Sequence, residues 1–171
     1  RHRYGYDPEK FFCTHARSEP FTILFLGHAE PRKGLHFALE AWSRSTAARS
    51  GRFLVAGDIE EGYAAYLERY KGARGLAFMG FRPDPNGLLN ECHALVLPSI
   101  EEGSALVTYE AMACGCIPLV STSSGAPCEH GKDGLFHDPG DIRTLAGHID
   151  ALFSDDALRL RLSEGALKSA A

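Results

Sequence analysis

The sequence predicts a doubly wound α/β domain, in which a parallel sheet of about six strands carries helices on both faces. Three observations support this fold class. Short apolar segments alternate with longer amphipathic segments from residue 21 onward. The apolar segments are uniformly hydrophobic, as expected for strands that are buried on both faces. Polar loops rich in glycine follow them, and ligands bind at such loops beyond the carboxyl ends of parallel strands.

Each element follows from its own pattern. The segment 21–26 is apolar apart from Thr22, and Leu35, Leu39 and Trp42 share one face of the helix that follows it. We expect strands at 21–26, 52–56, 76–79, 94–97, 117–120 and 135–136. We expect helices at 33–47, 63–70, 85–92, 141–153 and 156–169, with another starting near Ser104. Strand–helix–strand repeats of this kind imply right-handed crossovers and a parallel sheet.

Composition is typical of one globular domain. The chain has 171 residues, of which 44% are hydrophobic and 23% are charged, and its net charge is −4. The slightly acidic balance disfavours nucleic acid as a partner. No apolar run is long enough to span a membrane. Five cysteines without a regular framework favour free thiols. We therefore expect a cytoplasmic protein, with peripheral membrane association of a longer protein left open.

Residues 1–20 lack steady periodicity and contain Pro8, Pro20 and several aromatics. We interpret this segment as a linker whose aromatic side chains dock on the domain formed by residues 21–171. The chain begins with Arg1, and its last helix stops without a cap. Both features predict that the chain is part of a longer protein.

The loop from Gly27 to Gly34 joins the first strand to the first helix. Gly27 allows a close backbone approach to a ligand. Arg32 and Lys33 place positive charge at a helix start, which is unfavourable for the helix dipole alone and suggests that an anion binds there. The alternative is a solvated basic pair. The loop is neither a G-x-G-x-x-G fingerprint nor a P-loop.

The segment from Pro98 to Gly115 is the most informative part of the sequence. It joins the strand at 94–97 to a helix, and it carries Glu102 and Glu110 with seven residues between them. A helix N-terminus binds anions such as a diphosphate. Ionised carboxylates only accept hydrogen bonds, so they suit sugar hydroxyls rather than phosphates. A phosphate-sized site between two diol-binding carboxylates describes a nucleotide sugar.

These motifs, taken together, resemble a known family. Gly27…Lys33-Gly34, Gly80-Phe81, Pro98-Ser99…Glu102-Gly103…Glu110-Ala111-Met112-Ala113…Gly115 and Pro118 resemble the retaining glycosyltransferases of the GT-B group often called family 4. The resemblance implies that the chain is the C-terminal, donor-binding half of a GT-B enzyme, a Rossmann-like domain. It also implies that residues 1–20 are the interdomain linker, and that an absent N-terminal half binds the acceptor, which is a glycan, lipid or small molecule.

The resemblance also implies roles for individual residues. Lys33 and Glu102 match the catalytic positions: Lys33 binds the donor diphosphate, and Glu102 reaches the donor sugar's hydroxyls. Glu110 matches the carboxylate that holds the ribose diol. The remaining donor-binding positions are Gly27, His28 and Arg32 near the phosphates, Gly103, Ser104, Ala105 and Leu106 at the helix start, and Phe81 and Arg82 along the nucleobase. No metal or cofactor is expected, because the family needs no metal for its donor.

The sequence departs from the family pattern at three places. His28 replaces an arginine, Ser104-Ala105 replaces Phe-Gly, and the segment 124–131 lacks the frequent Gly-Gly-x-Pro-Glu. Two alternatives to a transferase remain. One is a non-catalytic nucleotide-binding fragment, and the other is a nucleotide-sugar epimerase of GT-B architecture. The spacing of Glu102 and Glu110 favours the transferase.

Overall fold

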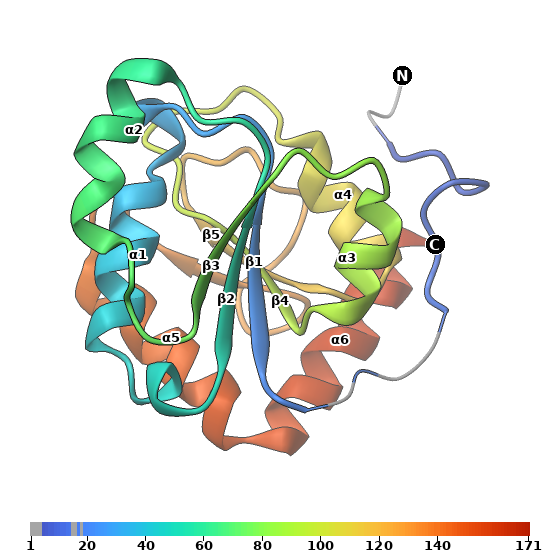
Figure 1. Cartoon of the computed structure of the whole chain (residues 1–171). Coiled ribbons are helices and arrows are strands. Elements are labelled where there is room, and N and C mark those ends of the chain that lie inside the picture. Colours follow the sequence, from blue (N-terminus) through green and yellow to red (C-terminus); the bar gives the residue numbers. More distant parts are fainter. Residues whose placement is uncertain (1–4, 15–16, 18) are drawn as a thin grey trace.

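A computed structural model describes residues 5–14, 17 and 19–171 of the chain. In this part, the sheet has six strands in the order β3-β2-β1-β4-β5-β6, and every neighbouring pair is parallel (Figure 1). The strands are β1 (Thr22–Leu26), β2 (Arg52–Ala56), β3 (Leu76–Gly80), β4 (Ala94–Leu97), β5 (Ile117–Ser121) and β6 (Leu135–His137). The predicted Rossmann-like fold class is confirmed.

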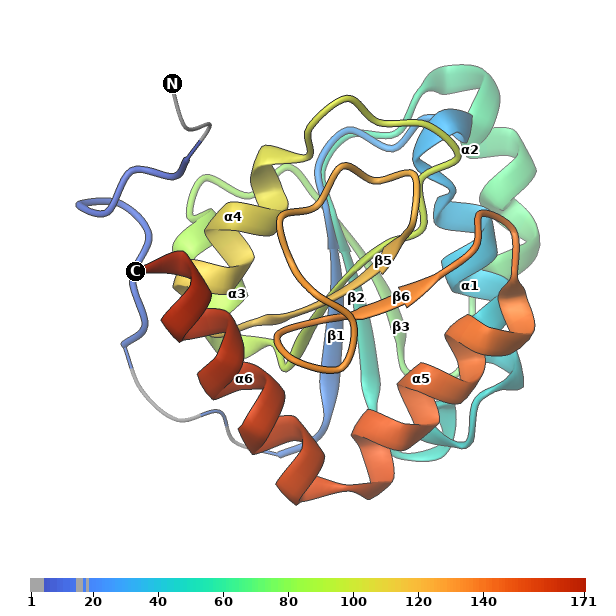
Figure 2. The same ribbon diagram turned by 180° about the vertical axis from the view of Figure 1, so that it is seen from behind.

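Helices cover both faces of the sheet. The helices are α1 (Leu35–Arg44), α2 (Glu61–Leu67), α3 (Pro85–Glu91), α4 (Leu106–Ala113), α5 (Ile142–Ser154) and α6 (Asp156–Ala170). Helices α1, α2 and α5 lie on one face, and α3, α4 and α6 lie on the other (Figures 1 and 2). No helix in the described part of the chain combines the length and the apolar character needed to cross a membrane.

Three predicted helices differ from the observed ones by more than one residue. The helix expected at 63–70 is observed as α2, which begins two residues earlier, followed by a 3-10 turn at Glu68–Tyr70. The helix expected at 33–47 is divided into a 3-10 turn at Pro31–Lys33, α1, and a second 3-10 turn at Thr46–Arg49. Gly34 causes the first break, because it adopts a left-handed φ of 68° between the turn and α1. The helix expected near Ser104 begins two residues later, at Leu106.

The core fills both sides of the sheet. The side chains of β1, β4 and β5 are almost wholly buried. Trp42 of α1 packs edge to face against Phe53 of β2. The indole of Trp42 donates a 3.0 Å hydrogen bond to the carbonyl of Arg74, which satisfies its one polar atom. All five cysteines are free thiols, as expected, and only Cys13 is exposed.

Part of the predicted linker packs against the domain. Phe11 is only 4% exposed and joins a cluster with Leu88 and Leu89 of α3. The Tyr6 hydroxyl donates a 3.2 Å hydrogen bond to the carbonyl of Ala170 at the end of α6. Phe12, in contrast, is 48% exposed. Residues 1–4, 15–16 and 18 of the predicted linker lie outside the described residues.

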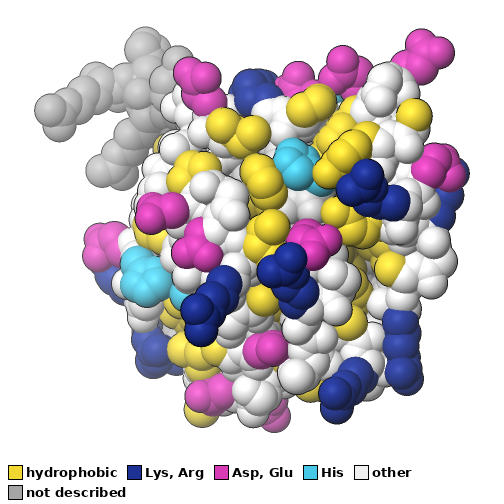
Figure 3. Space-filling view, turned by 90° about the vertical axis from the view of Figure 1, so that its left-hand side faces the viewer, with side chains coloured by type: hydrophobic (Ala, Val, Ile, Leu, Met, Phe, Trp, Pro, Cys, Tyr) yellow, Lys and Arg dark blue, Asp and Glu magenta, His cyan; other side chains and the backbone are white. Residues whose placement is uncertain are grey.

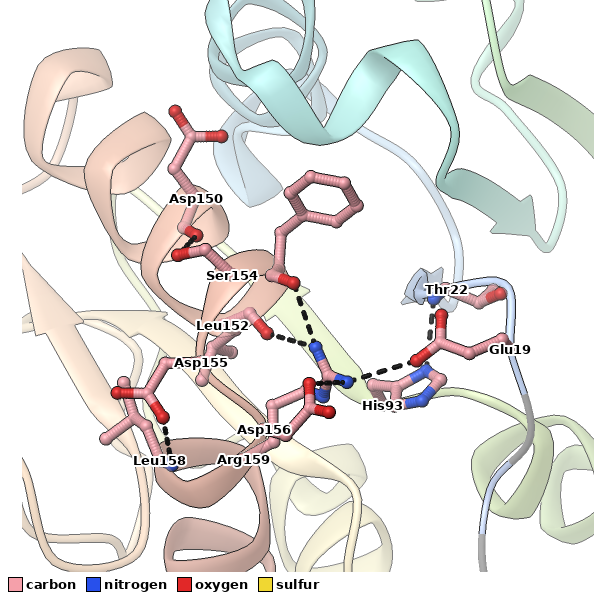
Figure 4. Close-up of polar contacts among 11 residues, drawn as sticks. Glu19, Thr22, His93, Asp150, Leu152, Ser154, Asp155, Asp156, Leu158 and Arg159 are labelled. Carbon is pink, nitrogen blue, oxygen red and sulfur yellow. Dashed lines mark hydrogen bonds and ion pairs between the residues drawn. The ribbon is translucent and has the colours of Figure 1, made fainter.

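A buried histidine connects two strands at the amino end of the sheet. Nδ1 of His93, just before β4, accepts a 3.1 Å hydrogen bond from the backbone N–H of Thr22 in β1 (Figure 4). Arg159 lies beside it, donates to the carbonyls of Leu152 and Phe153 at the end of α5, and forms an ion pair with Glu19. Burial, reinforced by the charge of Arg159, lowers the pKa of His93 to about 4.

The low pKa of His93 predicts a loss of stability in acid. Between pH 6.5 and about 4 the unfolded chain binds a proton at this residue and the folded chain does not, so the free energy of unfolding falls as the pH falls. We expect a loss of about 2 to 3 kcal/mol from this group over that range, measured by urea unfolding at a series of pH values.

The matched variant is His93→Asn, whose amide oxygen can still accept from Thr22 but cannot titrate. We expect this variant to show a flatter pH dependence than the wild-type protein. Parallel pH profiles for the two proteins would contradict the assignment.

Candidate functional site

The strand order places a crevice between β1 and β4. The chain leaves β1 toward α1 on one face of the sheet and leaves β4 toward α4 on the other face (Figure 1). The loops 27–34 and 98–105 therefore start at the carboxyl ends of two neighbouring strands and run toward opposite faces of the sheet. This reversal point is where open α/β sheets bind their ligands.

Backbone contacts join the two loops. A Cβ atom on Gly34 would lie 2.1 Å from the carbonyl oxygen of Pro98, so only glycine fits there. The N–H of Ile100 donates a 2.8 Å hydrogen bond to the carbonyl of Arg32, and Nη1 of Arg32 donates back to the carbonyl of Glu101 at 2.9 Å. The relative position of the two loops is therefore fixed by main-chain contacts rather than by side-chain packing alone.

A cleft of about 330 Å³ opens between these loops. It brings together seven of the predicted residues, from both loops and from the first turns of α4: Gly27, Lys33, Glu102, Ser104, Ala105, Leu106 and Glu110. Apolar walls complete it, formed by Leu26, Pro85, Leu97 and Val107. Sequence reasoning missed these four, although Leu26 and Leu97 were recognisable as the last residues of two strands.

Lys33 provides an uncompensated positive charge in the cleft. Its Nζ atom lies 3.8 Å from the position that a Cβ on Gly27 would take, so the glycine leaves room for the ammonium group. Among the described residues, Nζ has no hydrogen bond or ion pair. A half-buried cation without a partner favours an anionic ligand.

Arg32 is used differently from its neighbour. Its guanidinium pairs with Glu30 at 2.6 Å and with Oε1 of Glu102 at 3.5 Å. The other oxygen of Glu102 lies 3.4 Å from the hydroxyl of Ser99. Arg32 therefore lies outside the lining of the cleft and instead holds the carboxylate of Glu102 in position.

The start of α4 contributes backbone N–H groups. No side chain caps this helix at its first turn, so its first N–H groups are free to bind an anion. Ala105 occupies the N-cap position with a φ of −84°, a conformation that alanine adopts without strain. The absence of glycine at this position therefore leaves the helix start intact.

Glu110 lies one turn further along α4 and is half-buried. Burial raises its pKa above the usual value, and the nearby charge of Lys10 partly opposes this shift. In the described part of the chain, its carboxylate accepts no hydrogen bond and forms no ion pair. It is therefore free to accept hydrogen bonds from a ligand.

Four other predicted residues lie outside the cleft lining. His28 and Gly103 are exposed on the two loops, and Phe81 is 71% exposed after β3. Arg82 lines a separate hollow beside α3 with Met79 and Asp84. Within the described ranges, no three His, Cys, Asp or Glu side chains are placed to hold a metal ion.

The contact of Gly34 with Pro98 leads to a test of the site's architecture. Gly34→Ala requires a left-handed alanine and a displaced backbone, so we expect a loss of roughly 3 kcal/mol in the free energy of unfolding. Gly147→Ala in α5, where a Cβ meets open space, should instead stabilise the chain by about 0.5 to 1 kcal/mol. Urea unfolding measures both. Equal stability of Gly34→Ala and the wild-type protein would show that the two loops are not held as described.

Comparisons with known proteins identify the family of the chain. The family described as Glycosyl transferases group 1 matches residues 20–155. The lipopolysaccharide core biosynthesis glycosyltransferase LpsE of Rhizobium meliloti is 32% identical over 148 residues, which cover 83% of this chain and 42% of that protein. A Campylobacter jejuni N-acetylgalactosaminyltransferase acting on a diphospho-undecaprenol substrate is 28% identical over 150 residues, covering 86% and 39%.

Solved structures show the same fold. The C-terminal domain of a glycosyl transferase group 1 family protein from Francisella tularensis superposes with a TM-score of 0.84 at 20% identity, covering 96% of both chains. Anabaena HepE, solved with UDP-glucose, gives a TM-score of 0.84 at 22% identity, covering 97% of this chain and 50% of HepE. The chain spans about two fifths of the length of the curated relatives LpsE and the Campylobacter transferase. It belongs to the family of group 1 glycosyl transferases.

Proposed function

We propose that this chain is the donor-binding domain of a glycosyltransferase that transfers a sugar from a nucleoside diphosphate sugar to an acceptor hydroxyl. Residues 1–20 would link it to an N-terminal domain that binds the acceptor, which is a glycan, lipid or small molecule. One observation carries the proposal. A single cleft combines a free lysine, an uncapped helix start and two carboxylates, Glu102 and Glu110.

The diphosphate occupies the positive part of this cleft. Lys33 offers a full charge, and the N-terminus of α4 offers a partial charge with free N–H donors. Both face the same space as the backbone of Gly27. Anion binding here would relieve the unfavourable placement of Lys33 without a partner.

The two carboxylates bind the two sugars of the donor. Glu110 accepts hydrogen bonds from the ribose diol, and Glu102 accepts them from the hydroxyls of the transferred sugar. Arg32 and Ser99 keep Glu102 oriented. Apolar contacts from Leu26, Pro85 and Val107 form the walls against which the donor packs.

In the reaction, the bond between the anomeric carbon and the diphosphate oxygen breaks, and a bond to the acceptor oxygen forms. The acceptor proton passes to the departing diphosphate, and attack on the same face retains the anomeric configuration. Lys33 and the start of α4 stabilise the negative charge that develops on the diphosphate. Removing one such group typically costs about 3 to 4 kcal/mol of barrier. No metal or covalent carboxylate intermediate is required.

Related structures support this choice of ligand. Anabaena HepE has been solved with UDP and with UDP-glucose, and Staphylococcus aureus TarM with UDP, on a fold shared with this chain. The free cysteine thiols support a cytoplasmic location for the complete protein.

Calorimetric titration of this chain with UDP, GDP and ADP tests the proposal. We expect saturable binding of one nucleotide, which identifies the base. Lys33→Ala and Glu110→Gln should each weaken that binding by about tenfold or more, because each removes a charge-assisted contact. Lys168→Ala, an exposed lysine of α6, is the control and should bind normally. Unchanged affinity in Lys33→Ala and Glu110→Gln would refute the assigned roles.

The same titration has an expected pH dependence. The ionised form of Glu110 accepts charge-assisted hydrogen bonds at both oxygens, whereas protonation removes the charge and turns one oxygen into a donor, so affinity should fall as the pH drops through its raised pKa. Glu110→Gln should lack this decrease.

Two alternatives make different predictions. A non-catalytic nucleotide-binding fragment would bind but never transfer, which is what we expect of this chain without its acceptor domain. An epimerase would alter the donor sugar in the complete protein without any acceptor, whereas the proposed transferase forms its product only when an acceptor is present. In the complete protein, Glu102→Ala should lower turnover strongly.

A further inference from the structure

A second hollow lies beside the Pro31–Lys33 turn. It has a volume of about 360 Å³ and is lined by Pro31, His36, Glu60, Gly62, Tyr63 and Tyr66. Figure 3 looks onto the side of the molecule formed by α1 and α2 and shows hydrophobic side chains gathered around a histidine on this face. The proposed donor site uses none of these residues except through the shared turn.

Three rings give the hollow a defined shape. The rings of Tyr63 and Tyr66 are nearly parallel, with 10° between their planes and 6.2 Å between their centroids. The ring of His36 stands at 88° to both, at 5.8 Å from Tyr63 and 5.9 Å from Tyr66. Arg69 packs 4.4 Å over Tyr66 and restrains a ring that is 44% exposed. The exposed ring of Tyr66 and the half-buried ring of His36 thus form the aromatic surface of the hollow, and the buried ring of Tyr63 supports them.

Hydrogen bonds to Tyr63 hold the imidazole ring of His36 in place. The Tyr63 hydroxyl accepts a hydrogen bond from the backbone N–H of His36 at 2.9 Å, and it is also hydrogen-bonded to Nδ1 of His36, 2.7 Å away. With Nδ1 engaged by Tyr63, Nε2 has no partner among the described residues and is available to a hydroxyl, as a donor or an acceptor according to the tautomer. Glu60 contributes an exposed carboxylate that also has no hydrogen-bond or ion-pair partner within the described residues. An imidazole nitrogen and a carboxylate therefore flank the aromatic surface.

We propose that this hollow binds a sugar residue of a glycan, outside the donor cleft and beyond the function proposed above. Aromatic rings pack against the apolar C–H surface of a pyranose, and the carboxylate and the free imidazole nitrogen match its hydroxyls, which both donate and accept hydrogen bonds. Its volume falls within the range of small-ligand pockets. No lysine or arginine lines it, which disfavours a phosphate.

The hollow lies close to the cleft in which the donor is proposed to bind. Pro31 lines the hollow, and Lys33, two residues later, lines the cleft. The loop after β1 is also joined to the start of α2, because the N–H of Glu60 donates a 3.0 Å hydrogen bond to the carbonyl of Ala29. A glycan held in the hollow would therefore remain beside the edge of the sheet at which the donor is proposed to bind.

The chain offers a matched pair of variants for the test. Gly62 lies in α2 at the hollow, Gly147 lies in α5, and a Cβ atom on either meets nothing within 4 Å. Gly62→Leu fills the hollow, and Gly147→Leu makes the same change elsewhere. Both replace a helical glycine by a better helix former, so both should fold. Tyr66→Ala removes the exposed ring.

The experiment is a proton–nitrogen NMR titration of this chain with maltotriose, mannotriose and chitotriose, and with a proline-rich decapeptide, in the presence and absence of UDP. We expect one saccharide to shift the amides of Gly62 and Tyr66 saturably, with or without UDP. Gly62→Leu and Tyr66→Ala should weaken binding by at least about tenfold, while Gly147→Leu should leave it unchanged.

Three results would overturn the proposal: no saccharide shifting these amides, the decapeptide alone shifting them, or Gly62→Leu binding as the wild-type protein does. The readout is separate from nucleotide binding. A failed donor proposal therefore leaves this test intact, and a failed glycan site leaves the donor proposal intact.

Discussion

The contact between Gly34 and Pro98 is the constraint on which the candidate site depends. The left-handed turn at Gly34 lets one loop approach the carbonyl of Pro98 more closely than any side chain would allow. Because β1 and β4 are neighbours, this contact joins the two loops exactly where the chain reverses its direction across the sheet. The lysine of one loop and the helix start of the other consequently face the same space.

The neighbouring cations Arg32 and Lys33 show how the turn divides structural and binding roles. Arg32 bonds to Glu30, to the carbonyl of Glu101 and to Glu102, and in doing so joins the loops a second time. Lys33 faces the cleft with no partner among the described residues. Arg32 is exposed but paired with two carboxylates, and Lys33 is half-buried, so the two cations differ in their surroundings. We infer that Arg32 holds the two loops together and that Lys33 binds the ligand.

The sequence predicted the sheet well and the loops less well, for a physical reason. The strand at 52–56 was placed exactly, because buried parallel strands consist of continuous apolar runs bounded by glycine and polar residues. The helix expected from residue 33 is interrupted at Gly34, which adopts a left-handed φ and lies against the carbonyl of Pro98, a residue distant in the sequence. The ion pair of Arg32 with Glu102 was not predicted either, because these two residues are also distant in the sequence. The roles of Lys33, Glu102 and Glu110 remain predictions, although one cleft now contains all three.

The most direct test of the account is a crystal structure of this chain with the nucleoside diphosphate that it binds. The account predicts the diphosphate between Nζ of Lys33 and the first N–H groups of α4, with the ribose hydroxyls on Glu110. A nucleotide bound elsewhere, or one whose diphosphate lies on Arg32 or Arg82 away from Lys33, would contradict it.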